Sequence, residues 1–192
     1  MSRRNGLLDL AVLGLLHESP MHGYELRKRL NAVLGSFRAL SYGTLYPCLK
    51  SLVGRGWIVA SSALTPPAAS TSGRAKVVYE LTAEGKERFQ ELLGEAGPAA
   101  WEDESFDVRF AFFARTDAAV RLRILEGRRT RLEERLDNVK VASARARVRM
   151  DGYTLELQRH GLDAAEREVR WLNELIDTER STTPKRTGKT TR

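Results

Sequence analysis

Residues 41–57, SYGTLYPCLKSLVGRGW, are the part of this sequence that most constrains its fold. Their apolar residues recur at helical spacing and predict a short helix with a buried back: Leu45, Leu49, Leu52 and Val53. Ser41 is a suitable N-cap, and Gly54 and Gly56 are expected to end the helix. The opposite face is small, rich in hydroxyl groups and carries Lys50, which favours insertion into a DNA major groove. Taken alone, the segment is equally compatible with an ordinary core helix that has a polar outer face.

Two further helices are predicted upstream. Residues 7–16, LLDLAVLGLL, are almost wholly apolar. A membrane-spanning helix needs about 20 apolar residues, so this shorter run predicts a buried core helix. A turn at residues 19–23 leads to the amphipathic segment 24–34. The order helix, turn, helix, turn, helix indicates a helix-turn-helix domain.

Two strands are predicted downstream, at residues 57–61 and 76–81, because both segments are rich in strand-forming residues. Residues 64–75, LTPPAASTSGRA, have the composition of a loop. Two strands joined by a long loop beside a helix-turn-helix predict a winged helix, with Arg74 and Lys76 adding positive charge to the wing. Thr82 is the expected N-cap of a helix over residues 83–93.

These pieces together resemble the PadR family of transcriptional regulators. The matching stretches are LLDLAVLGLLHESPMHGYELRKRL, SYGTLYPCLKSLVGRGWI and VVYELTAEGKERF, in the family's order and spacing. The resemblance implies that the chain binds double-stranded DNA and represses transcription. The residues expected to contact DNA lie on the 41–53 helix, the helix before it and the wing: Tyr24, Ser41, Gly43, Thr44, Tyr46, Lys50, Arg74 and Lys76.

Proline 47 departs from the pattern expected of a recognition helix. Proline inside a helix removes a hydrogen bond and its ring clashes with the carbonyl one turn back, where this chain has Gly43. The helix is therefore expected to be kinked or to begin near Thr44.

The composition fits a polyanionic partner. The net charge of the 192 residues is +7 and the pI is about 9.8. Cys48 is the single cysteine, so an internal disulfide is impossible; core packing and a redox switch remain open for it. A cytoplasmic location and no membrane association are expected.

Two domains, a linker and a tail are predicted for a mainly α fold with a small β-wing. They are a winged helix-turn-helix at 1–95, a linker at 96–104, an antiparallel helical dimerisation domain at 105–179 and a basic, disordered tail at 180–192. The last helix carries an apolar stripe, and the residues expected at the centre of a dimer interface are Leu162, Val169, Leu172 and Ile176. Packing of this stripe within its own chain is the alternative.

A homodimer would place two recognition helices on one palindromic operator. The resemblance implies dimerisation through C-terminal helices, with a layout like the larger PadR subgroup, and release by a small aromatic molecule. The candidate effector pocket consists of Trp101, Phe106, Phe110 and Trp171, each of which could instead be plain core. A protein of another class, a helical adaptor that uses these surfaces for protein contacts, is the alternative function.

No catalytic, cofactor or metal site is predicted. His17, His22 and His160 are scattered without metal-ligand spacing. The sequence has neither a phosphate-binding loop motif nor a nucleophile-elbow motif. An enzyme is therefore not expected.

Overall fold

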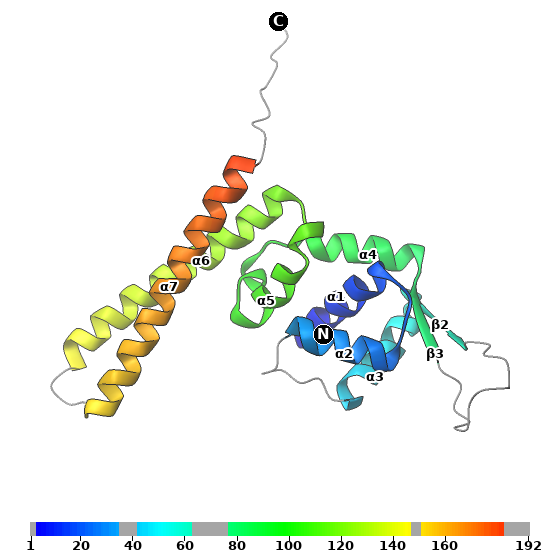
Figure 1. Cartoon of the computed structure of the whole chain (residues 1–192), viewed down its shortest axis with the longest axis horizontal. Helices are drawn as coiled ribbons and strands as arrows, with labels where there is room; N and C mark the ends of the chain where they lie inside the picture. Colours follow the sequence, from blue (N-terminus) through cyan, green and yellow to red (C-terminus); the bar gives the residue numbers. More distant parts are fainter. Residues whose placement is uncertain (1–2, 35–41, 63–76, 147–150, 183–192) are drawn as a thin grey trace, which may run out of the picture. The chain divides into compact units, whose positions relative to one another are not determined.

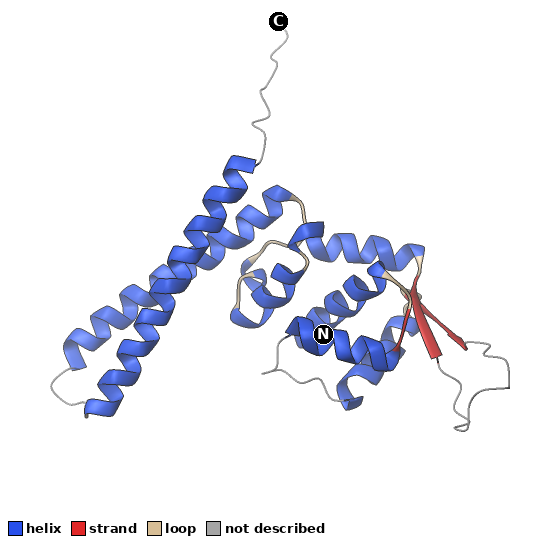
Figure 2. Cartoon of the chain, viewed as in Figure 1, coloured by secondary structure: helices blue, strands red, loops and turns tan. Residues whose placement is uncertain are grey.

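A computed structural model describes residues 3–34, 42–62, 77–146 and 151–182. The protein is mainly helical with one small antiparallel sheet, which confirms the predicted fold class (Figures 1 and 2). The chain divides into two compact units. The first unit comprises Met1–Glu95 and Asp107–Arg115, and the second unit comprises Ala96–Phe106 and Thr116–Arg192.

The first unit has the order of a winged helix. Its elements are α1 (Arg3–Glu18), β1 (Met21–His22), α2 (Gly23–Leu34), α3 (Tyr42–Gly54), β2 (Ile58–Ser62), β3 (Val77–Leu81) and α4 (Ala83–Gly94). The sheet order is β1-β3-β2 and both pairings are antiparallel. The predicted turn at residues 19–23 was wrong in one detail, because Met21 and His22 pair with Tyr79 and Val78 as a short strand.

The core of the first unit forms around α1. This helix is buried on nearly all sides, as its apolar sequence predicts, and helices α2, α3 and α4 pack against it. Its fully buried side chains are Leu10, Ala11, Val12 and Leu13. Leu26 and Leu30 of α2 and Phe89 of α4 complete the centre of this core.

Helix α3 runs through Pro47 as one helical element and begins at Tyr42, before the predicted start near Thr44. The other predicted alternative, a kink at Pro47, stays a prediction. Pro47 has no N–H, so it cannot donate the helical hydrogen bond to Gly43 O one turn back. The helix ends as predicted: Gly56 has a φ of 73° and donates to Val53 O at 2.9 Å, while Trp57 donates to Leu52 O at 3.0 Å. This pair of bonds is a Schellman motif, in which glycine takes the left-handed conformation without strain.

The start of α4 is fixed by Thr82, as predicted. The Thr82 side chain accepts a hydrogen bond from Gly85 N at 3.0 Å, which satisfies a backbone donor of the first turn. Trp57 O accepts from Thr82 N at 3.1 Å, and Thr82 Oγ1 lies within hydrogen-bond distance of both Gly56 O (2.7 Å) and Trp57 O (3.0 Å). The strand that follows α3 is therefore joined directly to the beginning of α4, and the backbone passes close to Gly85.

The segment Asp107–Arg115 completes the first unit from beyond the predicted boundary at residue 95. It holds the second part of α5 (Asp103–Ala111) and the 3-10 helix η3 (Phe113–Arg115). Val108 and Phe112 enter the core, and Arg109 donates to Leu92 O at 2.8 Å and Glu95 O at 2.9 Å. These contacts assign the segment to the winged helix, although residues 105–179 were predicted to form the C-terminal domain.

The second unit is dominated by a hairpin of two long helices, α6 (Ala118–Ala146) and α7 (Gly152–Thr182), preceded by the 3-10 helix η2 (Pro98–Ala100). Ion pairs show their antiparallel order, since Arg121 binds Glu179 at 2.7 Å and Lys140 binds Glu166 at 2.9 Å. The buried side chains between the helices include Leu125, Leu132, Leu136, Leu172 and Ile176. Helix α7 includes residues 180–182 of the predicted tail, and residues 183–192 lie outside the described part of the chain.

Candidate nucleic-acid interface

Helix α3 has the two faces that its sequence predicts. Its back is buried through Leu45, Leu49 and Leu52. Its outer face exposes the predicted contact residues Gly43, Thr44, Tyr46 and Lys50. Val53 was predicted to face the core but is 39% exposed, because it lies at the margin of the apolar stripe near the end of the helix. The outer face therefore offers hydroxyl groups, a lysine and little bulk, which suits a groove of duplex DNA.

A broad groove adjoins this face. It has a volume of about 1060 Å³ and takes its walls from α2, α3 and the strands β1 and β3. Two predicted DNA contacts, Tyr24 and Tyr46, line it and are 69% and 49% exposed. Ser41, Arg74 and Lys76, the other predicted contacts, lie outside the described residues.

The groove is also lined by polar residues that the sequence did not single out for DNA contact, including His22, Glu25, Lys28 and Arg29. His22 Nδ1 lies 3.1 Å from Val77 O, and since a carbonyl only accepts, Nδ1 carries the hydrogen. Arg29 forms ion pairs with Glu25 at 3.1 Å and Glu18 at 3.5 Å. Among the described residues Lys28 and Lys50 have no ion-pair partner, so their charge is available to a phosphate.

Burial, and secondly the neighbouring Tyr46, raise the pKa of the Tyr79 phenol in the same groove. Both causes favour the neutral phenol over the phenolate. Tyr79 therefore adds no negative charge to the groove at neutral pH. The groove remains suited to an anionic partner.

Beneath α3, a small polar cluster ties the helix to α1. Asp9 is buried on α1, accepts from Cys48 Sγ at 3.4 Å and forms an ion pair with Arg55 at 3.2 Å. Burial, followed by the charge of Asp9, raises the pKa of the Cys48 thiol well above its usual range. A thiol that stays protonated is a poor nucleophile, so the structure favours the packing role of Cys48 over the redox role.

We expect native Cys48 to react slowly with iodoacetamide. At about pH 8, the folded chain should be alkylated at least about tenfold more slowly than the urea-unfolded chain, because the thiolate is the reactive species. Mass spectrometry of timed samples measures the rate, with Cys48→Ser as the unreactive control. Equal rates in the native and unfolded chains would contradict the protective role of burial and Asp9.

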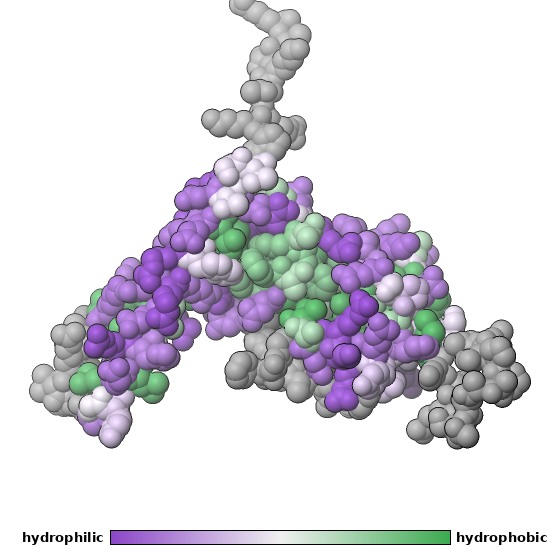
Figure 3. Space-filling model, viewed as in Figure 1, coloured by the Kyte–Doolittle hydropathy of each residue, from purple (hydrophilic) through white to green (hydrophobic). Residues whose placement is uncertain are grey.

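The residues predicted at a dimer interface divide into two pairs. Leu172 and Ile176 are buried within the α6–α7 hairpin of a single chain. Leu162 and Val169 are only partly buried. Large apolar side chains that α7 leaves exposed include Tyr153 at 92% and Leu157 at 71%. In Figure 3, apolar surface is visible near the free end of the hairpin within mostly hydrophilic surroundings.

The four aromatic residues predicted to line an effector pocket are divided between the two units. Phe106 and Trp171 pack edge to face in the second unit, with ring centres 6.2 Å apart. Trp101 of the same unit covers Gly127, where a Cβ would overlap the indole ring. Phe110 belongs to the first unit and packs on Phe113 with ring centres 4.9 Å apart. Each of these aromatic rings has an intramolecular packing partner.

Within the described residues, no helix is both long enough and apolar enough to cross a membrane. The same part of the chain contains no group of three or more His, Cys, Asp or Glu side chains placed to hold a metal ion.

A helix-turn-helix followed by two wing strands makes the first unit a winged-helix domain. Residues 12–91 match the family described as the transcriptional regulator PadR-like family, and this part of the chain is a PadR-like domain. The family resemblance predicted from the sequence is thereby confirmed.

One curated relative is the negative transcriptional regulator PadR of Bacillus subtilis (strain 168), which is 29% identical over 87 residues. The match covers 45% of this chain and 45% of that relative, so it spans less than half of the relative's length.

Three solved structures are also similar. Bacillus subtilis PadR in complex with operator DNA is 20% identical, with 90% of this chain and 98% of that chain covered and a TM-score of 0.42. The same protein in complex with p-coumaric acid is 20% identical, with 91% and 99% covered and a TM-score of 0.40. The putative transcriptional regulator TA0346 from Thermoplasma acidophilum is 33% identical, with 45% and 77% covered and a TM-score of 0.39.

Proposed function

We propose that this chain is a transcriptional regulator that binds double-stranded DNA through α3 and the adjoining groove. The observation that carries the proposal is the outer face of α3 in a PadR-like domain: Thr44, Tyr46 and Lys50 are exposed above a fully buried apolar back. The net charge of +7 supports a polyanionic partner. In this proposal Thr44 approaches base edges, Lys50 binds phosphate, and Tyr24 and Tyr46 contact the backbone from the groove.

We further propose that the regulator represses transcription as a homodimer on a palindromic operator. Repression is supported by the matching domain of a relative that is described as a negative regulator. Dimerisation is supported by the exposed apolar side chains of α7, including Tyr153 and Leu157, beside the partly buried Leu162 and Val169. Leu172 and Ile176 support the interface indirectly, since they hold α7 on α6. Release by a small aromatic molecule belongs to the same proposal.

Substitutions on α3 should separate phosphate binding from base recognition. Lys50→Ala is expected to weaken binding to promoter DNA about fivefold and to lower the salt slope by about one unit. Thr44→Ala should instead reduce the ratio of operator affinity to random-DNA affinity, because its hydroxyl lies where base edges are read. Fluorescence anisotropy with the DNA upstream of the coding region, over a salt series, measures both quantities.

Lys86→Ala is the matched control for charge, because Lys86 is also exposed and lies on α4, outside the groove. Its loss should leave both the affinity and the salt slope close to those of the unaltered chain. If Lys50→Ala and Thr44→Ala bind DNA as the control does, the α3 face is not the DNA surface. An adaptor that binds a protein partner would then be the better description of the chain.

A further inference from the structure

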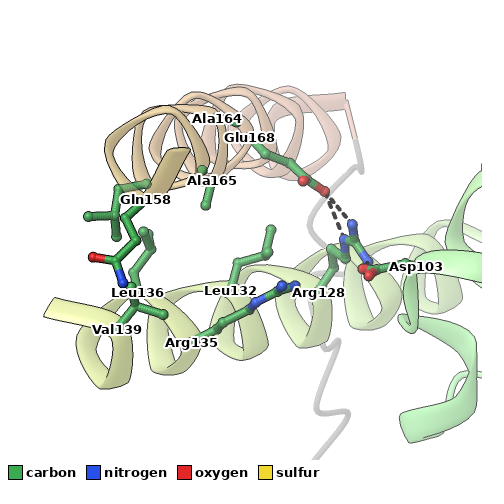
Figure 4. A pocket seen from close by; sticks show the side chains of 12 residues that line it. Asp103, Arg128, Leu132, Arg135, Leu136, Val139, Gln158, Ala164, Ala165 and Glu168 are labelled. Carbon is green, nitrogen blue, oxygen red and sulfur yellow. Dashed lines mark hydrogen bonds and ion pairs between the residues drawn. The ribbon is translucent and has the colours of Figure 1, made fainter. Parts of the chain in front are cut away.

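Three charged side chains are buried in the part of the chain that the structure describes: Asp9, Arg109 and Arg128. Arg128 pairs with Glu168 across the α6–α7 hairpin (Figure 4), and Arg109 donates to backbone carbonyls at the end of α4. Both of these arginines join elements of the scaffold. Asp9 differs from them, because it holds α3, the helix whose outer face carries the proposed DNA contacts.

The carboxylate of Asp9 contacts the α3 region at two points. Its Oδ1 accepts from Cys48 Sγ at 3.4 Å in the middle of the helix, and its Oδ2 pairs with Arg55 Nη1 at 3.2 Å just past the last helical residue. Cys48 and Arg55 are seven residues apart, which places them on the same side two turns from each other. Arg55 is also held by the ring of Trp57, whose centre lies 4.8 Å from its guanidinium carbon. One carboxylate thus fixes both the middle and the end of the helix.

The burial of α3 does not require this ion pair. Leu45, Leu49 and Leu52 already form a fully buried apolar back. Apolar burial selects the inward face of a helix but is not directional, whereas a hydrogen-bonded carboxylate fixes the direction of its partners. A buried ion pair often adds little net stability, because desolvation of the two charges offsets their attraction. The contribution expected from Asp9 is therefore to the geometry of α3 more than to the stability of the domain.

The side of α3 that Asp9 holds adjoins the proposed DNA face. A cavity of about 310 Å³ in the first unit is lined by Asp9, Cys48 and Arg55 and also by Thr44 and Ser51. Thr44 is exposed and lies one turn before Cys48. The outer atoms of a helical side chain lie about 5 Å from the helix axis, so a rotation of about 10° moves them by about 1 Å. That displacement exceeds the range of about 0.5 Å over which hydrogen-bond lengths vary.

We propose that Asp9 is a positioning residue for DNA recognition: by holding Cys48 and Arg55, its carboxylate fixes the rotation of α3 and thereby places Thr44 against base edges. Asp9 itself makes no contact with DNA. The inference rests on the proposed function, because it requires that the outer face of α3 binds DNA. It adds to that function a buried residue of α1 that determines how well sequences are discriminated.

The first test removes the charge of Asp9 and keeps the shape of its side chain. We define the discrimination ratio as the affinity for promoter DNA divided by the affinity for random DNA of the same length. Asp9→Asn should lower this ratio about tenfold and leave the salt slope within about half a unit, because the phosphate contacts stay in place. Asp9→Glu should recover part of the ratio, since it keeps the charge and the adjoining cavity has room for a longer side chain. Fluorescence anisotropy over a salt series measures both quantities.

Two double variants test how Asp9 acts. Asp9→Asn/Arg55→Gln replaces the ion pair by two neutral amides at unchanged net charge, so it leaves no buried charge unpaired. It should lower the discrimination ratio about as much as Asp9→Asn alone. In a Thr44→Ala chain, Asp9→Asn should lower the ratio less than about threefold, because the contact that Asp9 positions is already absent.

A purely structural role is tested by a core variant of the same unit. Phe112→Leu shrinks a buried ring that packs on Phe89, and it should lower the urea midpoint at least as much as Asp9→Asn while leaving the discrimination ratio unchanged. Far-UV circular dichroism checks that each variant is folded under the binding conditions.

Alkylation of Cys48 tests the contact with Asp9 without DNA. In Asp9→Asn, burial still opposes the thiolate but the charge of Asp9 no longer does. Iodoacetamide should therefore alkylate Cys48 about threefold faster than in the unaltered chain. An unchanged rate would show that Asp9 does not act on Cys48, and the proposal would fall.

The DNA experiments can also overturn the proposal. An unchanged discrimination ratio in Asp9→Asn, additive losses in the Thr44→Ala chain, or an equal loss in Phe112→Leu would each do so. A salt slope that falls by about one unit in Asp9→Asn/Arg55→Gln would make Arg55 a phosphate contact instead of a link to Asp9. If the unaltered chain does not bind promoter DNA, the proposed function fails and this inference fails with it. If the chain binds and only the discrimination ratio of Asp9→Asn is unchanged, the inference about Asp9 fails alone.

Discussion

Alanine in place of Gly85 is expected to destabilise the first unit by about 3 kcal/mol, because a buried position would be overpacked against backbone. A Cβ at Gly85 would overlap Trp57 O and come within 2.9 Å of Leu81 Cδ1. The backbone cannot move away easily, since Thr82 N donates to Trp57 O and the Thr82 hydroxyl donates to this carbonyl or to the neighbouring Gly56 O. The hydrogen bond from Gly85 N to Thr82 Oγ1 fixes the other side of the contact.

Gly94→Ala in the same helix is the matched control, because nothing lies within 4 Å of a Cβ built there. Gly94→Ala should change the free energy of unfolding by less than about 1 kcal/mol, and in the stabilising direction, since alanine has the higher helix propensity. Urea unfolding would be followed through Trp57, with Trp101 and Trp171 of the second unit replaced by Phe so that only the first unit is observed. If Gly85→Ala and Gly94→Ala unfold at the same urea concentration, the close contact between Gly85 and Trp57 O can relax around the new methyl group.

Phe112→Ala is expected to cost the first unit about 3–4 kcal/mol. Phe112 is buried, packs edge to face on Phe89 with ring centres 5.8 Å apart, and fills the space beside Gly14. Alanine would leave a cavity at this point in the core. The loss would also weaken the attachment of the whole Asp107–Arg115 segment, which reaches the core through Val108 and Phe112.

Phe113→Ala provides the comparison, because this neighbouring ring is only partly buried and is absent from the core. Its removal should cost about 1 kcal/mol, mostly through the lost contact with Phe110. The same Trp57 signal measures both variants. Equal losses for Phe112→Ala and Phe113→Ala would mean that the segment does not complete the core of the first unit.

Local patterns of the sequence predicted the winged helix well where a single residue determines the start or the end of a helix. Gly56 ends α3 and Thr82 begins α4 because a left-handed residue and a side-chain cap are local devices. The strand β1 was not predicted, because two residues are too few to show alternation. It exists because Met21 and His22 pair with β3, a partner distant in sequence.

The partner of an apolar stripe was harder to predict than the stripe itself. Leu172 and Ile176 were correctly identified as apolar helix positions, but periodicity does not state whether α6 or a second chain buries them. Phe106 and Phe110 likewise lie on one helix, yet they belong to different units. The groove beside α3 could not be predicted from spacing either, because Tyr24 and Tyr46 meet there only through the packing of α2 and α3.

The discontinuous make-up of the first unit has a consequence for biosynthesis. The N-terminus of a chain emerges from the ribosome first, and domains generally fold in order from the N-terminus as they emerge. Residues up to Glu95 leave the ribosome with the place of Phe112 beside Gly14 still empty. The nascent winged helix is therefore expected to reach its full stability only after Arg115 has emerged, and folding of the α6–α7 hairpin follows as a later step.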